Sequence, residues 1–238
     1  MSKCLNAGVS ALRAALAAWL MVVAAGAAVA GPLEDGQTAY NSGDYPTALR
    51  LWRPLAEQGD ARAQTALGFM YGGGYGVRLD HAEAIRLYRQ GAERGYAAAQ
   101  YNIGISQNGL GVPQDYSEAV KWFRKGVAQG DAGAQAGLGV MYEMGYGVPL
   151  DYAEAVRLYR QSADQGYATG LHNLGVMYRD GHGVPQDHVQ AHMWLDLAAS
   201  RFFASEKENR DKALNDRDFV ASKMTPAQIA QAQKLSRD

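Results

Sequence analysis

Apolar residues recur along the middle of the chain at spacings of three and four positions, the period of one face of an α-helix. Between Asp151 and Gly166, the residues on this face are Ala155, Leu158, Tyr159 and Ala163. A second segment runs from about Ala168 to Arg179 and places inward Leu171, Leu174, Gly175 and Tyr178. The pattern therefore predicts pairs of helices joined by short turns, and an all-α fold without strands.

This pattern repeats along the chain. The dipeptide Gly-Val begins at Gly76, Gly111, Gly147 and Gly183, with spacings of 35, 36 and 36 residues. Further columns of aspartate, alanine and glycine keep the same register. A period in this range is typical of a solenoid, in which each unit buries its apolar face only against its neighbours. Such folds present extended surfaces, so a binding function is expected rather than a catalytic one.

Helix boundaries follow from capping residues. Asp151 and Glu154 have the form of a capping box, in which each side chain bonds the backbone of the other residue. The same pair recurs as Asp80/Glu83, Asp115/Glu118 and Asp187/Gln190. The Gly-x-Gly turns lack the strand and the third glycine of a dinucleotide-binding loop, so we assign them to helix capping. The small Gly175 is expected to let the two helices of its repeat approach closely.

The two ends of the chain differ from the repeats. Residues 1–30 have a basic start, the apolar run Ala14 to Ala25, and Ala28-Val29-Ala30 as a cleavage site. This is the pattern of a secretory signal peptide cleaved after Ala30; the alternative is an uncleaved anchor. The sequence thus divides into 1–30, a helical lead-in at 31–42, repeats at 43–200 and capping helices at 201–238. In the last part, Thr225-Pro226 begins a helix whose Ile229, Ala232 and Leu235 could cover the open end of the array.

Composition narrows the possible partners. Removal of residues 1–30 takes away Lys3 and Arg13, which leaves 21 basic and 24 acidic residues and a net charge of −3. This charge argues against nucleic acid as a partner. The single cysteine, Cys4, leaves with the signal peptide, so the mature chain must be held together by packing. We expect a monomeric protein of the periplasm or the extracellular space, without membrane insertion after cleavage and without a cofactor.

The segment from Ala153 to Asp187 resembles the Sel1-like repeat, a relative of the tetratricopeptide repeat. The resemblance covers Gly43 to about Ser200, as four complete repeats and the first helix of a fifth. It implies a right-handed α-solenoid of helix–turn–helix repeats, and an adaptor or regulator that binds another protein. Bacterial members of the family include periplasmic regulators of sensor kinases and exported proteins that meet host factors.

Two columns of basic residues share one face of the first helices. The first column contains Arg50, Arg86, Lys121 and Arg157, and the second, three positions later, contains Arg53, Arg89, Arg124 and Arg160. Stacked repeats would align them into a stripe that suits an acidic partner. The competing interpretation is helix stabilisation by ion pairs within each helix, worth a few tenths of a kcal/mol each. The pairs it predicts are Glu83–Arg86, Glu154–Arg157, Arg53–Glu57, Arg89–Glu93 and Arg160–Asp164.

Tyrosines form a further candidate binding set. Tyr75 and Tyr146 lie at turn tips, where they could contact a partner or pack locally. Tyrosines near the ends of second helices are assigned to the core: Tyr71, Tyr142 and Tyr178.

Histidines of the fifth repeat have the spacing of metal ligands. His188 and His192 lie four residues apart, with Asp196 one turn further. The glutamate of a metalloprotease helix is missing, and the shell is incomplete unless His182 or His172 joins. We interpret these histidines as packed side chains and predict no metal site.

No catalytic constellation is recognisable, since the mature chain lacks a cysteine nucleophile and no serine lies in a strand–turn–helix elbow. The sequence therefore predicts an exported, non-catalytic scaffold whose concave face binds a protein, in an envelope signalling or assembly process. Two alternatives stay open: a cell-wall or carbohydrate-associated accessory factor or enzyme, and a secreted factor that binds host proteins.

Overall fold

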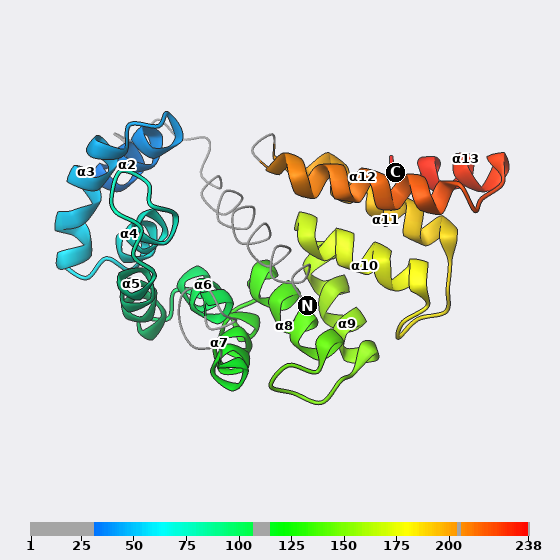
Figure 1. The fold of residues 1–238 in the computed structure, drawn as a ribbon, viewed down its shortest axis with the longest axis horizontal. Coiled ribbons are helices and arrows are strands. Elements are labelled where there is room, and N and C mark those ends of the chain that lie inside the picture. Colours follow the sequence, from blue (N-terminus) through cyan, green and yellow to red (C-terminus); the bar gives the residue numbers. More distant parts are fainter. Residues whose placement is uncertain (1–30, 107–114, 204–205, 238) are drawn as a thin grey trace. The chain divides into compact units, whose positions relative to one another are not determined.

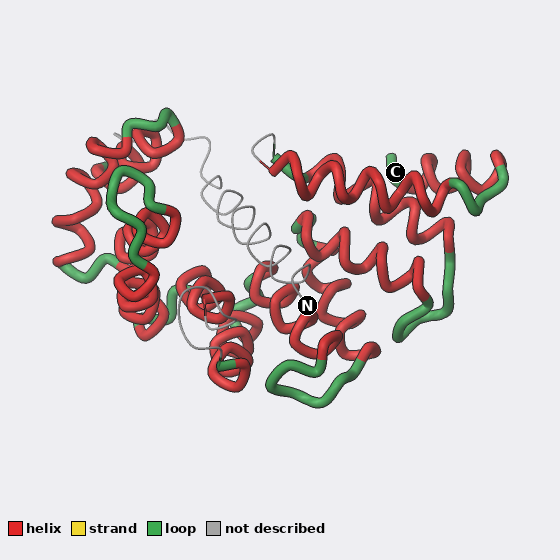
Figure 2. Tube along the Cα trace, in the orientation of Figure 1, coloured by secondary structure: helices red, strands yellow, loops and turns green. Residues whose placement is uncertain are grey.

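The computed structural model describes residues 31–106, 115–203 and 206–237. The predicted signal peptide, Cys4, and the turn with Gly111, Val112 and Pro113 lie outside this range. The described residues form twelve α-helices and no strand, as the apolar spacing predicts (Figures 1 and 2). None of these helices is long and apolar enough to cross a membrane.

The chain divides into two compact units, one ending at Gln129 and the other beginning at Gly130. The first contains α2 (Pro32–Asn41), α3 (Tyr45–Glu57), α4 (Ala61–Gly73), α5 (His81–Glu93), α6 (Ala97–Ser106) and α7 (Tyr116–Ala128). The second contains α8 (Ala132–Met144), α9 (Tyr152–Asp164), α10 (Ala168–Asp180), α11 (His188–Arg201), α12 (Lys207–Ala221) and α13 (Pro226–Leu235). From α2 to α7 and from α8 to α12, helices that follow one another in sequence pack together within each unit, whereas α13 packs on α11.

Aspartates cap the first helices at the predicted positions. The side chains of Asp80 and Asp151 each accept a hydrogen bond from the backbone N–H three residues later, at 3.0 Å. The prediction of a complete capping box is wrong here, because the carboxylates of Glu83 and Glu154 do not accept from the backbone N–H of the capping aspartate. They accept instead from Arg86 and Arg157. A complete capping box is found at Thr225 and Gln228, which begins α13 as predicted.

The two glycines of the Gly181-His182-Gly183 turn have distinct roles. Gly181 ends α10 in the left-handed conformation, with φ of 73°, as a C-cap glycine does. Gly183 also has a positive φ, and a β-carbon on it would lie 2.4 Å from the carbonyl oxygen of Tyr152 at the start of α9. Capping therefore explains only the first glycine. The second allows the loop to rest on the preceding repeat, where the ring of His182 stacks on that of Tyr152 at 4.6 Å.

Glycine in the second helices sets the distance to the helix that follows. A β-carbon on Gly175 would lie 2.8 Å from Cγ of Leu195 in α11, and one on Gly139 2.5 Å from the Tyr159 ring in α9. The expectation that Gly175 brings together the two helices of its own repeat is therefore wrong. Gly170 has that role, since its β-carbon would meet Oγ of Ser162 in α9 at 2.3 Å. The closest helix pairs are a second helix and the next first helix.

Two alanine substitutions in α4 test this packing. Gly68→Ala would place a β-carbon 2.8 Å from the ring of the buried Tyr88, so we expect the free energy of unfolding to fall by about 1 to 2 kcal/mol. Gly72→Ala, one turn later, has 3.5 Å to its nearest neighbour, Ala84, and should leave stability unchanged or raise it by up to about 1 kcal/mol. Urea denaturation followed by circular dichroism measures both. Equal effects would contradict the close approach at Gly68.

The last two helices cover α11. Val220 of α12 is buried in a cluster with Ala191 and Leu195, and Ala232 of α13 is fully buried. Ile229 is half-buried, whereas Leu235 is 39% exposed and covers less than the spacing predicts.

Candidate functional site

The exposed face of the first helices carries both basic columns. In α5, Ala84, Leu87 and Tyr88 are buried against neighbouring helices, which turns Arg86 and Arg89 toward solvent. The same periodicity leaves all eight cations exposed. Six of them lie in the unit that ends at Gln129, and Arg157 and Arg160 lie in the other. Their alignment into one continuous stripe stays a prediction.

Three of the four cations of the first column are bound to glutamates of their own helices. Arg86 donates two hydrogen bonds to the Glu83 carboxylate, at 2.7 and 2.6 Å, and Arg157 makes the same pair of bonds to Glu154. Lys121 lies 3.6 Å from Glu118. The hydrogen bond from Arg157 holds the pKa of Glu154 below its usual value. The predicted pairs Glu83–Arg86 and Glu154–Arg157 therefore form, and Lys121–Glu118 is a further pair of the same kind.

The second column behaves differently. The expected pairs Arg53–Glu57 and Arg89–Glu93 are wrong, since neither arginine has a carboxylate within 4 Å among the described residues. Arg160 does not bind Asp164 either. It donates to the Tyr178 hydroxyl and lies over that ring, at 5.8 Å from the centroid. Glu57 and Glu93 lie four residues after Arg53 and Arg89, toward the C-terminus of each helix, and neither forms an ion pair with its arginine.

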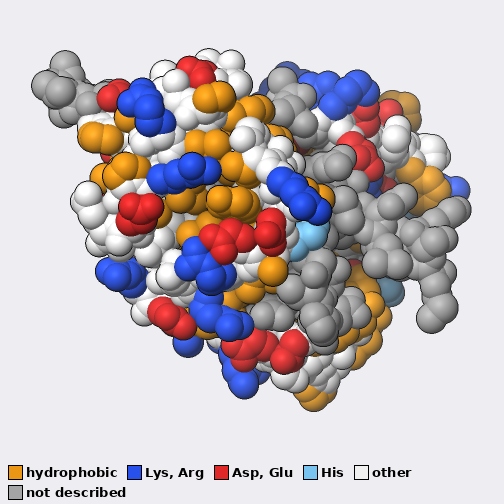
Figure 3. Space-filling view, turned by 60° about the vertical axis from the view of Figure 1, so that its left-hand side comes forward, with side chains coloured by type: hydrophobic (Ala, Val, Ile, Leu, Met, Phe, Trp, Pro, Cys, Tyr) orange, Lys and Arg blue, Asp and Glu red, His pale blue; other side chains and the backbone are white. Residues whose placement is uncertain are grey.

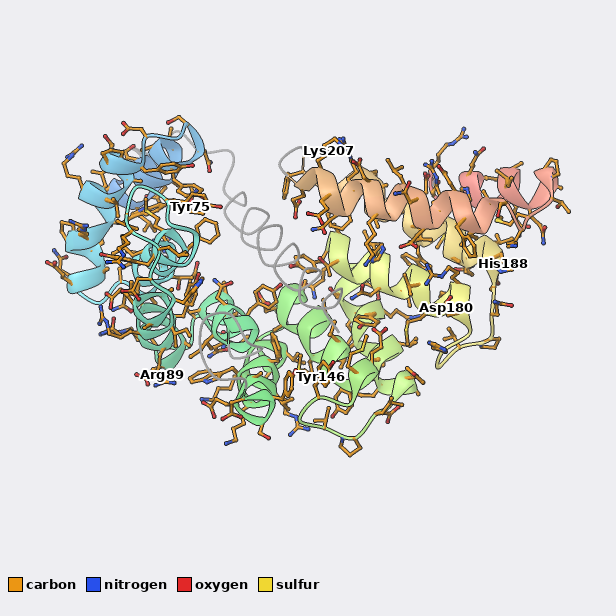
Figure 4. The ribbon with its side chains drawn as sticks, in the orientation of Figure 1. Tyr75, Arg89, Tyr146, Asp180, His188 and Lys207 are labelled. Atoms are coloured by element: carbon orange, nitrogen blue, oxygen red, sulfur yellow. The ribbon has the colours of Figure 1, made fainter. Side chains whose placement is uncertain are left out.

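One face of the molecule has mixed charge. Figure 3 shows Lys and Arg side chains separated by Asp and Glu, with hydrophobic side chains between them. Figure 4 labels Arg89 on α5 and Tyr75 in the loop before that helix. The arrangement suits side-by-side polar and apolar contacts with a protein segment better than it suits a uniformly charged polymer.

The two turn-tip tyrosines differ in surroundings. Tyr75 is half-buried and packs against the rings of Tyr45 and Phe69, at 5.5 and 5.2 Å. This favours the packing interpretation for Tyr75. Tyr146 is 37% exposed, in a loop where Met144 and Leu150 are 49% and 56% exposed. Its role in binding stays a prediction. Tyr71, Tyr142 and Tyr178 are half-buried beside the core clusters.

A polar network between α10 and α12 is invisible in the sequence pattern. Asp216 accepts from Nε2 of His172 at 2.9 Å and from Nη1 of Arg179 at 2.7 Å, while the same guanidinium also binds Asp180. One helix further, Asp196 accepts from Arg217 and from Ser236, each at 3.0 Å. Asp216 and Arg217 come from a charged segment without periodicity, so only the docking of α12 on the repeats brings them to these partners. The network fixes the end of the array.

The histidines with ligand spacing are separated by their surroundings. His192 is 4% exposed, and its Nδ1 has no hydrogen-bond partner among the described residues. Burial lowers its pKa, which favours the neutral ring. Asp196, the third expected ligand, is bound to Arg217 and Ser236. Over the described ranges, no three His, Cys, Asp or Glu side chains are placed to share a metal ion.

A family model for the Sel1 repeat matches five segments of the chain, residues 33–60, 61–96, 97–131, 132–167 and 168–201. From the second segment on, each pairs a second helix with the first helix that follows, in agreement with the closest contacts of the fold. The match also includes α2, which the sequence pattern leaves outside the repeats as a lead-in. No curated protein matches the chain.

Solved structures show the same fold. A protective antigen present in uropathogenic Escherichia coli strains is 33% identical, with a TM-score of 0.72 over 87% of this chain and 44% of that chain. The chain thus spans less than half of the antigen. A Sel1 repeat protein from Oxalobacter formigenes is 26% identical, with a TM-score of 0.68, and the match covers 87% of this chain and 84% of that one. An immunity protein from Pseudomonas aeruginosa shares the fold at 16% identity, with a TM-score of 0.52 over 78% and 82% of the two chains.

Proposed function

Because the chain belongs to the Sel1 repeat family, whose repeats are generally scaffolds for protein binding, we propose that it is an exported, non-catalytic adaptor. It binds an acidic segment of another protein through the exposed face of its first helices. In this way it regulates an envelope signalling or assembly process.

The division of the basic residues into two columns supports this proposal. The guanidinium groups of Arg86 and Arg157 already donate hydrogen bonds to glutamates, so they have fewer N–H groups available for a partner. Arg53 and Arg89 are exposed, on consecutive first helices of one unit, and no carboxylate of the described residues lies within 4 Å of either. An arginine fork without a partner is well suited to bind the carboxylates of an incoming segment. Arg53 and Arg89 of the second column are therefore the candidate contact. The glutamate-paired Arg86, Lys121 and Arg157 of the first column support their own helices.

The two columns provide their own matched control. We expect Arg53→Gln with Arg89→Gln to weaken binding roughly tenfold or more, because charge-assisted bonds to the partner are lost. Arg86→Gln with Arg157→Gln removes the same charge and should change affinity by less than about threefold. The partner is first captured by cross-linking in the native cells, and affinities are measured by titration calorimetry. Equal losses in both variants would reduce the effect to net charge, and no loss in either would exclude this surface.

Export is a separate part of the proposal. The apolar run and Ala28-Val29-Ala30 support cleavage after Ala30, so we expect the protein from its native cells to begin at Gly31. Intact-mass spectrometry of the purified protein measures this directly. A mass that still includes residues 1–30 would contradict cleavage. Accumulation in the culture medium without lysis would favour the secreted, host-binding alternative, toward which the similarity to a protective antigen also points.

A further inference from the structure

Glutamine pairs, each with one buried and one exposed member, join neighbouring helices at two equivalent places. Nε2 of Gln129 donates to Oε1 of Gln100, and Nε2 of Gln165 donates to Oε1 of Gln135, each at 2.8 Å. Gln100 and Gln135 are buried in α6 and α8. Their partners, Gln129 and Gln165, follow the ends of α7 and α9. Each bond links a second helix to the end of the first helix that follows it.

The next pair along the chain is replaced. The positions 36 residues after Gln135 and Gln165 are Leu171 and Arg201, which cannot form this bond. A cavity of about 270 Å³ lies here. Its lining comes from the end of α9, the start of α10 and one face of α11: Ala163, Asp164, Gln165, Gly166, Leu171, Trp194, Leu197 and Arg201.

The floor of this cavity is apolar and includes the half-buried indole of Trp194. Trp122, 72 residues before Trp194, occupies the equivalent position; its ring is covered by Nζ of Lys125 at 3.9 Å, and its N–H donates to Glu118 at 2.7 Å. In α11, the residue equivalent to Lys125 is Leu197, and Nε1 of Trp194 has no acceptor among the described residues. Lys125 lies over the ring of Trp122, whereas the equivalent residue beside Trp194 is the uncharged Leu197.

The rim of the cavity carries one charge of each sign. Asp164 and Arg201 have no ion-pair partner within 4 Å in the part of the chain that the structure describes, and they do not bind each other. The guanidinium of Arg201 extends over Gly166, where a β-carbon would lie 3.7 Å from its Nη1. The carbonyl end of α9 lies on the Asp164 side and adds negative potential there.

We propose that this cavity binds a small zwitterion with an apolar side chain, of the class of the α-amino acids. Its ammonium group pairs with Asp164 and the end of α9, and its carboxylate pairs with Arg201. Its side chain covers Trp194, Leu171 and Leu197. The volume is below the range of about 300 to 1,000 Å³ that is usual for larger ligands, and suits a single amino acid. The site is independent of the second-column arginines.

Indole N–H resonances in ¹H–¹⁵N spectra of the full chain test the proposal. L-leucine and L-phenylalanine are the probes. The resonance of Trp194 should shift on titration, while those of Trp52 and Trp122, which are already hydrogen-bonded, should not. Isocaproate, without the ammonium group, and isoamylamine, without the carboxylate, should each bind roughly ten- to a hundredfold more weakly than L-leucine. Equal shifts with all three leucine-like probes would overturn the zwitterion, and no shift with either amino acid would overturn the site.

The chain itself supplies the closing variant. Leu171→Gln with Arg201→Gln restores the pair found at Gln100 and Gln129, so it should abolish binding and preserve the helical circular dichroism spectrum. Arg201→Gln alone, at an exposed position, should weaken the binding of isocaproate, the probe with a carboxylate, and leave the binding of isoamylamine unchanged. Arg94→Gln, which removes the equivalent arginine beside Gly59, is the control and should have no effect. Unchanged amino-acid binding in the double variant would contradict the assignment.

Discussion

Gly183→Ala is expected to lower the free energy of unfolding by about 2 to 5 kcal/mol. Two costs add at this position. An alanine with φ near 70° is strained by about 1 to 2 kcal/mol, and its β-carbon would lie 2.4 Å from the carbonyl oxygen and 2.5 Å from the carbonyl carbon of Tyr152. These are backbone atoms at the start of α9, so they cannot rotate away. Thermal and urea denaturation of the purified variant measure the loss.

Gly181→Ala, two residues earlier in the same turn, is the matched control. Its φ of 73° is almost the same, but the nearest atom to its β-carbon is Cβ of the exposed Gln186, at 3.3 Å. We expect only the conformational cost, about 1 to 2 kcal/mol. The difference between the two variants isolates the contact between the loop and the preceding repeat. If both lost the same stability, that contact would contribute nothing.

Asp216→Asn is expected to destabilise the chain by about 2 to 4 kcal/mol. It removes the charge that His172 and Arg179 share, and the His172 side chain is only 8% exposed. Asp218→Asn, on the same helix, removes a carboxylate that pairs with Arg217 but is 65% exposed, so it should cost less than about 1 kcal/mol. Urea denaturation compares the two. Similar losses would show that the network does not anchor α12.

The effect of Asp216 has a defined pH dependence. Burial by itself raises the pKa of Asp216, but the hydrogen bond from His172 and the charges of His172 and Arg179 outweigh it, so the pKa lies below its usual value. A carboxyl with a depressed pKa stabilises the fold above the pKa of the unfolded chain, about 4, and loses that contribution as pH falls through the folded pKa. The difference between the parent chain and Asp216→Asn should therefore be full at neutral pH and shrink below about pH 4. A difference that stays constant down to pH 2 would contradict the ion pairs.

Much of the fold follows from local rules. The aspartate caps, the apolar spacing and the turn glycines fix where helices begin and end, because each acts within a few residues of itself. The Glu83–Arg86 and Glu154–Arg157 pairs are equally local, and they form as expected. The expected pairs four residues apart do not form, and Arg160 instead contacts the hydroxyl and the ring of Tyr178, a partner 18 positions away that helix spacing does not reveal.

The sequence by itself therefore determined the repeat, the helices, their caps and the exposure of the basic columns, since all of these depend on spacing along one helix. Only the tertiary structure decided what faces what between helices. It placed Gly175 against α11 and packed the ring of Tyr75 within an aromatic cluster. It formed the hydrogen bond between Asp216 and His172, which are 44 positions apart. It also opened a cavity where Leu171 and Arg201 replace a glutamine pair. Contacts of this kind arise from the packing of distant side chains, for which a one-dimensional period carries no information.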